Sequence, residues 1–411
     1  MLKPASSLRP IEFGRRLRQL PRNIWVLTLA SFLTDVSTDM MVHLVPFLLA
    51  NVLGVRTVTI GLIEGVAETT ASLLKLWSGR LSDRLGRRKW LTVAGYGLST
   101  VAKPFLALAG SWPAVLGVRF VERMGKGIRT APRDALIADS IEEKHRGLAF
   151  GLHRAGDTVG ATLGLLIALA VIWLRQGDQL TLARATFQTL VWLSVIPALL
   201  AVLLLAAGIR EQPAARQAQP SFLAWGGLER PFKRFLLVIV LFTLGNSSDA
   251  FLILRAQAAG LNIVQVMGLL VLFNLVYAVV AMPAGSLSDK VGRRQLLLAG
   301  WTLYGLVYVG LALVRTGWQV GLLFALYGVY YGSTEGIARA FVADLVTREK
   351  RGTAYGWFNA AVGLAALPAS LLAGLLWQGI GSWGGLGIQA PFLFGAVLSI
   401  MAVGLLRAWF P

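Results

Sequence analysis

The sequence predicts an all-α integral membrane protein with twelve transmembrane helices, arranged as two six-helix bundles related by a pseudo-twofold axis. Hydrophobic residues make up 56% of the chain and charged residues only 14%, whereas a soluble protein carries about 25% charged residues. Apolar runs of about twenty residues, the length of a membrane-spanning helix, follow one another along the chain. A charged motif between two of these runs returns at the corresponding place in the second half, which indicates a duplicated architecture.

The apolar runs define the expected spans and domains. They cover residues 24–50, 58–79, 90–109, 112–138, 148–174, 187–208, 234–257, 265–285, 295–314, 318–342, 353–377 and 389–408. The longest polar segment lies midway, at residues 209–233, and is rich in Pro, Gln and Ala, as expected of a linker. We therefore expect an N-terminal arm, a first bundle, a linker and a second bundle, with bounds at 1–23, 24–208, 209–233 and 234–411.

Basic residues predict the orientation of the chain, because cytoplasmic loops of membrane proteins carry an excess of Lys and Arg. The loops on one side hold most of the bases, as do the N-terminal arm and Arg407, whereas the alternate loops hold few. Both termini are therefore expected in the cytoplasm, in a multi-pass protein of the cell (inner or plasma) membrane. The first 22 residues hold six bases and no apolar leader, which indicates an arm on anionic membrane lipid and not a signal peptide.

The composition also excludes several classes of function. The formal net charge of +19 could indicate a nucleic-acid partner, but the bases lie in short loops between apolar runs, so we expect none. The absence of cysteine excludes disulfides, thiolate metal sites and cysteine nucleophiles. No phosphate-binding glycine loop and no sizeable soluble domain are recognisable, so we expect neither an enzyme nor a cofactor.

The most specific pattern is the charged motif, which reads GRLSDRLGRRK at Gly79–Lys89 and GSLSDKVGRRQ at Gly285–Gln295, 206 positions later. We expect a tight loop between two helices in each half, where glycine permits close approach or a positive φ. The aspartates can pair with arginine in one conformation and lose that partner in another; the alternative is a charged turn without a gating role. The expected cytoplasmic gate residues are Gly79, Asp83, Arg84, Gly86, Arg87, Arg88, Gly285, Asp289, Gly292, Arg293 and Arg294.

A second repeat supports the duplication. Ala138-Asp139 and Arg146-Gly147 match Ala343-Asp344 and Arg351-Gly352 at an offset of 205. With these motifs the chain resembles the major facilitator superfamily (MFS) of secondary transporters over essentially its whole length. The resemblance implies alternating access between the two halves, usually driven by a proton gradient, in a monomer that carries a small molecule.

Two further motifs of that family are matched in part. The fourth-span motif Arg-Phe-x-x-Gly-x-Gly-x-Gly corresponds to Arg119–Gly127, where Arg123 replaces a glycine. The fifth-span motif of family antiporters keeps glycines at positions 156, 160 and 164, but Ala161 replaces its proline. The resemblance therefore suggests export by antiport and leaves the cargo open.

Ionisable residues inside the spans are the candidate proton-coupling or substrate residues, because each costs about 2.5–3.5 kcal/mol at the membrane centre. Asp35, Asp39 and His43 are spaced four residues apart, which places them on one helical face. They could carry a proton or bind a cation, and Asp and His also suit a divalent metal. The other interpretation is a polar stripe bonded to neighbouring helices. We expect no resident metal, with His43 as the one candidate ligand.

The remaining candidates are spread over both halves. In the second span, Glu64 and Glu68 could accept protons or be neutralised by arginine. Arg119 matches the family arginine that lies near proton-carrying acids. The second half has fewer charges, so we expect proton coupling in the first half and more of the apolar cargo wall in the second. The other candidate residues are Arg123, Arg154, Asp157, Asp249 and Glu335.

Three transport functions follow from these residues. The first is proton-coupled efflux of a small organic or amphipathic compound. The second is transport of an anionic solute held by the arginines of the fourth and fifth spans. The third is export of a divalent metal through Asp35, Asp39 and His43. A receptor that does not transport is the alternative from another class of function.

Overall fold

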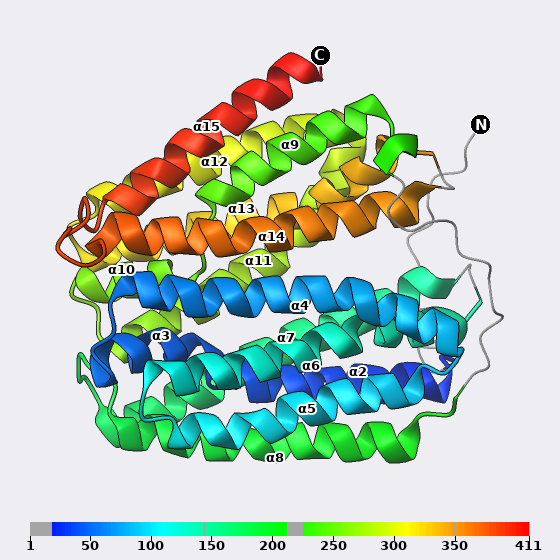
Figure 1. Cartoon of the computed structure of the whole chain (residues 1–411), viewed down its shortest axis with the longest axis horizontal. Helices are drawn as coiled ribbons and strands as arrows, with labels where there is room; N and C mark the ends of the chain where they lie inside the picture. Colours follow the sequence, from blue (N-terminus) through cyan, green and yellow to red (C-terminus); the bar gives the residue numbers. More distant parts are fainter. Residues whose placement is uncertain (1–18, 143–144, 212–224, 348–349, 411) are drawn as a thin grey trace.

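The computed structural model describes residues 19–142, 145–211, 225–347 and 350–410. Its regular elements are all helical, and an isolated bridge joins Ile380 to Trp383. The long helices run roughly parallel in two groups, one below the other in Figure 1. The lower group comes from the first half of the chain and the upper group from the second. Most of the expected arm and linker, at 1–18 and 212–224, lies outside the described residues.

The helices correspond to the expected apolar runs. The first half contains α2 (Arg22–Asp39), η1 (Val42–Leu44), α3 (Val45–Phe47), η2 (Leu48–Val52), α4 (Thr57–Leu85), α5 (Lys89–Leu108), α6 (Trp112–Asp139), α7 (Arg146–Gln176) and α8 (Arg184–Gly208). The second half contains η4 (Trp225–Gly227), α9 (Arg230–Gly245), α10 (Ala250–Ala258), α11 (Ile263–Val291), α12 (Arg293–Leu313), α13 (Gly317–Asp344), α14 (Arg351–Gln378) and α15 (Ala390–Trp409). We call the end of the molecule where α2 begins and α15 ends the termini end.

Within the described ranges, nine stretches are long and apolar enough to cross a membrane. Three long helices, α4, α6 and α13, are not among them. They have 29, 28 and 28 residues, about 42 Å each at 1.5 Å per residue, so their length exceeds the roughly 30 Å of membrane hydrocarbon. Their lower hydropathy has a structural cause, because many of their polar side chains line a cavity inside the protein.

The charged motif is mostly helical, which corrects the expectation of a loop over its whole length. α4 continues to Leu85 and ends at Gly86 with φ +61°, and α11 continues to Val291 and ends at Gly292 with φ +96°. Charged side chains at the end of a membrane helix do not disrupt its backbone hydrogen bonds. The helix therefore continues for several residues after the sequence has become polar. A Cβ added to Gly79 would lie 3.3 Å from Ala131, but the close approach expected at Gly285 is absent among the described residues.

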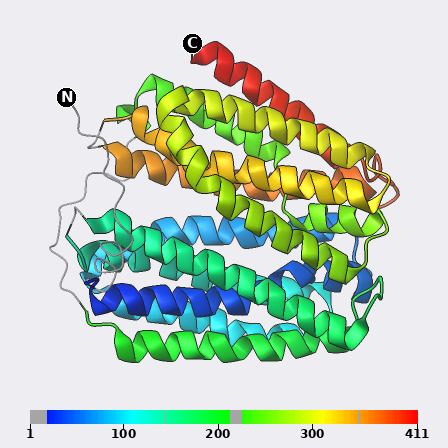
Figure 2. The same ribbon diagram turned by 180° about the vertical axis from the view of Figure 1, so that it is seen from behind.

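Two pairs of long helices make most of the contact between the halves. α4 packs along α14 (Figure 1), and α7 contacts α11 on the other side of the molecule (Figure 2). A Cβ added to Gly61 of α4 would lie only 2.1 Å from the backbone oxygen of Ser370 in α14. Thr57 Oγ1 donates to the carbonyl of Gly374 at 3.0 Å, and Thr69 Oγ1 donates to that of Gly363 at 2.6 Å. We call this contact the α4–α14 seam.

One helix in each half is interrupted at a corresponding place. The first span breaks after Asp39, where α2 gives way to short 3₁₀, α and π segments. The seventh span breaks between Gly245 and Ala250, which separates α9 from α10. Interrupted helices in corresponding positions of two halves commonly mark the binding site of a transporter.

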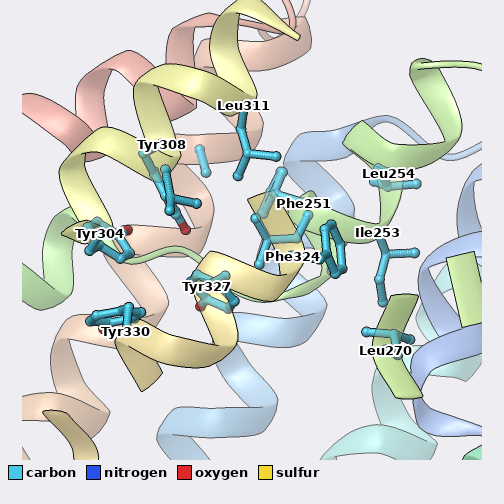
Figure 3. Packing of buried hydrophobic residues seen from close by; sticks show 14 of the residues in the cluster. Phe251, Ile253, Leu254, Leu270, Tyr304, Tyr308, Leu311, Phe324, Tyr327 and Tyr330 are labelled. Carbon is cyan, nitrogen blue, oxygen red and sulfur yellow. The ribbon is translucent and has the colours of Figure 1, made fainter. Parts of the chain in front are cut away.

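The core of the second half is rich in aromatic residues. Tyr304, Tyr308, Tyr327 and Tyr330 are buried together, and the rings of Tyr304 and Tyr308 stack 4.1 Å apart (Figure 3). Tyr304 Oη donates to the carbonyl of Gly245 at 2.9 Å, which satisfies a backbone group at the end of α9. The aromatic core thus supports the interruption of the seventh span.

Candidate functional site

A cavity of about 680 Å³ lies between the two halves. Its wall comes from α2, α4, α6 and α7 of the first half and from α9, α11, α12, α13 and α14 of the second. The sequence candidates Asp35, Asp39, Glu68, Arg154, Asp157 and Glu335 all line it. Six further charged side chains in the wall come from Lys75, Lys126, Arg129, Arg133, Asp134 and Arg339.

The cavity lies on the termini side of the α4–α14 seam. At the other end the seam is reinforced by the backbone N–H of Thr57, which donates to Gln378 Oε1 at 2.8 Å, and by Arg56, which donates to the carbonyl of Gly381 at 3.1 Å. Gln257 of α10 also donates to the carbonyl of Leu180, which follows α7, at 2.9 Å. These contacts join the halves at the end opposite the termini.

Asp35 and Asp39 face the cavity with different partners. Asp39 Oδ1 lies 3.1 Å from His43 Nε2, one turn further along the first span. Asp35 forms no hydrogen bond or ion pair with another described residue. A carboxylate that opens onto a cavity inside a membrane protein and has no fixed cation is free to bind a proton or a cationic ligand.

Arg119 lies behind the cavity wall and is fully buried at 0% exposure. Its Nη2 donates to Glu64 Oε2 at 2.9 Å and its Nη1 donates to Glu122 Oε2 at 2.7 Å. Arg123 similarly lies 3.6 Å from Glu68. Arginines of the fourth span therefore neutralise carboxylates of the second span, which was one of the two interpretations of Glu64 and Glu68.

The fifth span contributes a link between the halves. Arg154 Nη2 donates to Tyr277 Oη at 2.8 Å and lies 3.2 Å from Glu335 Oε2, although Asp157 is only three positions away in the same helix. Arg154 points into the cavity, where the second half offers a carboxylate, whereas Asp157 lies 3.8 Å from His153.

Lys103 is a buried charge near the site that sequence reasoning missed. Its Nζ donates to Thr38 Oγ1 at 3.1 Å and to Ser37 Oγ, in the last turn of α2. Ser37 in turn donates to the carbonyl of Ser194 at 2.5 Å. Lys103 thus holds α5 against α2 next to Asp39, and a lone lysine inside an apolar run was the signal that could have revealed it.

In each half, one motif arginine joins the motif aspartate to an aspartate at the end of another long helix. Arg88 pairs with Asp83 at 3.3 Å and also with Asp139 at the end of α6. In the second half this arginine is Arg293, which aligns with Arg87 and not with Arg88; it pairs with Asp289 at 3.8 Å and with Asp344 at the end of α13. The backbone N–H groups of Arg88 and Lys89 also donate to Glu211 in the first half. Of the other motif bases, Arg84 and Arg87 are exposed, and Arg294 donates to the carbonyl of Arg407 at 3.2 Å.

A second cavity of about 150 Å³ lies between the two interrupted helices. Asp39 and His43 of the first span face Asp249 of the seventh across it. Tyr327 Oη donates to Asp249 Oδ1 at 3.2 Å. In the part of the chain that the structure describes, no three His, Cys, Asp or Glu side chains come together as metal ligands.

Comparisons with known proteins agree with this architecture. The sequence model of the Major Facilitator Superfamily matches residues 27–271 and 234–411. An uncharacterised MFS-type transporter of Methanocaldococcus jannaschii is 37% identical over 394 residues, which cover 94% of each chain. Multidrug resistance protein MdtG of Enterobacter lignolyticus is 25% identical over 327 residues, 76% of this chain and 75% of that protein.

Solved structures share the fold. The crystal structure of a mutant of the nucleoside transporter NupG matches with a TM-score of 0.79 and 13% identity, over 95% of this chain and 100% of that chain. The family match covers nearly the whole sequence, and the paired halves, the repeated motifs and the cavity between them agree with it. This chain belongs to the Major Facilitator Superfamily of membrane transporters.

Proposed function

We propose that this membrane transporter moves a small organic solute by alternating access and couples the movement to protons. The observation that carries the proposal is Asp35, whose carboxylate lines the cavity and bonds to no other described residue. Asp35 can accept a proton without first breaking an ion pair, whereas Glu64 and Glu122 would have to leave Arg119. An ionisable group at such a place is costly to insert, which favours a functional role.

The contacts between the halves support alternating access. The α4–α14 seam closes the cavity from the end opposite the termini, and its contacts are helix packing and a few hydrogen bonds. On the termini side, Arg154 bridges to Glu335 and Tyr277. Both contacts join surfaces of different halves, so a rocking motion can open one end while closing the other.

The direction that we propose is export from the cytoplasm. The excess of Lys and Arg in the loops at the termini end predicts that this end is cytoplasmic, so the cavity would face the cytoplasm. Export is further supported by the antiporter-like glycines of the fifth span and by the multidrug resistance relative. We propose a monomer in the cell membrane as the functional unit.

One observation favours a second candidate, an anionic solute. Lys75 and Lys126 line the large cavity, and neither forms an ion pair with a described residue. Together with Arg129 they could hold a carboxylate or sulfonate. The experiment below therefore compares cationic, anionic and metal probes directly.

We expect Asp35→Asn to uncouple transport from protons. The protein is reconstituted into liposomes that contain a pH-sensitive dye, with phenyltrimethylammonium, benzenesulfonate and Mn²⁺ as probes. With the transported class, the wild type should move protons in response to the probe, and Asp35→Asn should reduce that flux about tenfold or more. Exchange of labelled probe across the membrane should continue, because the amide keeps the shape of the cavity but cannot carry the proton.

The matched control is Asp178→Asn, which makes the same change at an exposed position between α7 and α8. It should leave both proton flux and exchange at wild-type levels. Proton flux equal to the wild type in Asp35→Asn would contradict the coupling role. Absence of exchange with all three probes would contradict transport of these classes.

A further inference from the structure

The small cavity between the interrupted helices is a neighbour of the large one, because Asp39 and Asn274 line both. Its remaining wall includes Asp249 together with leucine and aromatic side chains, of which Leu270, Phe324 and Tyr327 are labelled in Figure 3. We call this space of about 150 Å³ the inner cavity.

Apart from the imidazole of His43, the ionisable side chains in the wall of the inner cavity are acidic. Its wall contains the carboxylates of Asp39 and Asp249 and no Lys or Arg from the described residues. Asp249 is bonded by the neutral hydroxyl of Tyr327 and has no cationic partner in the described part of the chain. Asp39 has only the imidazole of His43 at 3.1 Å. In contrast, the large cavity has as many basic as acidic side chains in its wall.

The rest of the wall suits an organic cation better than a metal ion. Phe273 and Tyr327 stack with their ring centres 5.4 Å apart and present aromatic surface, which attracts cations and accommodates apolar groups. A cavity of about 150 Å³ holds one benzene-sized ring, so the methyl groups of a quaternary ammonium would extend past Asp39, which also lines the large cavity. No three His, Cys, Asp or Glu side chains of the described residues come together as metal ligands.

The position of the two carboxylates adds an independent argument. Asp39 ends α2 and Asp249 precedes α10, so each half contributes one carboxylate from its interrupted helix. Helix interruptions in membrane proteins are tolerated where they line a cavity, and they mark the substrate sites of transporters with repeated halves. A ligand between these two carboxylates would contact both halves, which is what alternating access requires of a substrate.

We propose that the inner cavity binds the ammonium group of a small organic cation that carries one aromatic or compact apolar group. The cation lies between Asp39 and Asp249, and the apolar group lies against Phe273, Phe324 and Tyr327. This inference rests on the proposed transport function and assigns its substrate class. The carboxylate of Asp35 remains available for the proton, because it lines the large cavity and not the inner one.

The test is equilibrium binding of labelled phenyltrimethylammonium to the purified full-length protein, compared with labelled tert-butylbenzene, its neutral isostere. The wild type should bind the cation at least about tenfold more tightly than the isostere, and benzenesulfonate should not compete. Asp249→Asn should weaken cation binding about thirtyfold and leave tert-butylbenzene binding unchanged, because only the charge is removed. Asp178→Asn, the exposed control, should bind both probes like the wild type.

The ratio of the affinities for phenyltrimethylammonium and tert-butylbenzene distinguishes the loss of a charge from misfolding, because a misfolded cavity would bind neither ligand. An unchanged ratio in Asp249→Asn would overturn the proposal, as would competition by benzenesulfonate. Tyr327→Phe keeps the ring and should retain cation affinity within about threefold. If cation binding depends on Asp249 but no probe is exchanged in liposomes, the proposed binding site is supported and the proposed transport is refuted. If benzenesulfonate alone is exchanged, transport is supported and the proposed cation site is refuted.

Discussion

Replacing Arg119 by alanine is expected to destabilise the protein by about 3–5 kcal/mol, the usual cost of leaving a buried charge without its partner. Arg119 is completely buried and is shared by Glu64 and Glu122, at 2.9 and 2.7 Å. Without the guanidinium, two carboxylates of α4 and α6 would face each other inside the bundle. Thermal unfolding of the purified protein in detergent measures the effect, as a large fall in Tm or a loss of folded protein.

A variant that removes the carboxylates as well should recover much of that stability. The triple change Arg119→Gln, Glu64→Gln and Glu122→Gln keeps polar groups of similar length and leaves no buried charge. Arg315→Ala is the matched control, because Arg315 is exposed beyond the end of α12, and it should cost about 0.5 kcal/mol or less. If the single Arg119→Ala variant unfolds at the wild-type temperature, Arg119 does not stabilise the contact between Glu64 of α4 and Glu122 of α6.

The same variants distinguish a structural role of Arg119 from a role in proton coupling. If Arg119 acts only to hold α4 against α6, the triple variant should exchange substrate and move protons like the wild type. If the family resemblance is right and Arg119 also controls proton-carrying acids, the triple variant should fold but lose proton coupling. Exchange and proton flux in liposomes distinguish the two outcomes.

The helices could be predicted because hydropathy is a local property of the sequence. The expected span 112–138 agrees with α6 to within one residue, even though this helix carries many charges. The expected span 58–79 ends six residues before α4 does, since its last turns leave the apolar layer while remaining helical. Hydropathy therefore locates membrane-spanning segments better than it locates helix ends.

The pairing of charges between helices could not be predicted. Arg154 and Asp157 are one turn apart in the sequence, yet Arg154 pairs with Glu335, which is 181 positions away. Spacing within one helix defines which residues share a face, but it cannot show which other helix supplies the partner. Whether an acid such as Glu64 is neutralised or free is decided by that packing.

A local signal for the interruption is present in each half, but it locates the break only in the second. Residues 246–249 are four consecutive polar residues, Asn-Ser-Ser-Asp, whose side chains compete for backbone hydrogen bonds and disfavour a helix. In the first half, Pro46 cannot donate to the carbonyl of Val42 and disfavours a continuous helix, but residues 40–44 contain neither Gly nor Pro, so the break directly after Asp39 is not indicated. There the last turn of α2 is held by Lys103 of α5 and Ser194 of α8, which are contacts between helices.

Adding a single methyl group at Gly61 is expected to open the end of the molecule opposite the termini. The Cβ of Gly61→Ala would lie 2.1 Å from the backbone oxygen of Ser370 and 2.8 Å from its carbonyl carbon. A backbone atom cannot move aside as a flexible side chain can, so α4 and α14 must separate. Overpacking of this kind costs about 1–3 kcal/mol, which corresponds to a population shift of about five- to 150-fold.

That cost falls on one conformation only, because the α4–α14 seam is closed here and would be open in the alternate state. Gly61→Ala should therefore shift the equilibrium toward the alternate state instead of simply unfolding the protein. The chain has no native cysteine, so Ala161→Cys in the large cavity provides a unique label site. A membrane-impermeant maleimide should label this cysteine about tenfold faster from the side opposite the termini when Gly61→Ala is present.

The matched control is Gly97→Ala in α5, where an added Cβ would meet no described atom within 4 Å. Both substitutions raise helix propensity by the same amount, about 1 kcal/mol. A difference between their labelling rates is therefore caused by the α4–α14 seam. Gly97→Ala should leave the labelling rates from both sides unchanged. Equal labelling rates in Gly61→Ala and Gly97→Ala would show that the α4–α14 seam does not control access, and alternating access would then have to depend on other contacts between the halves.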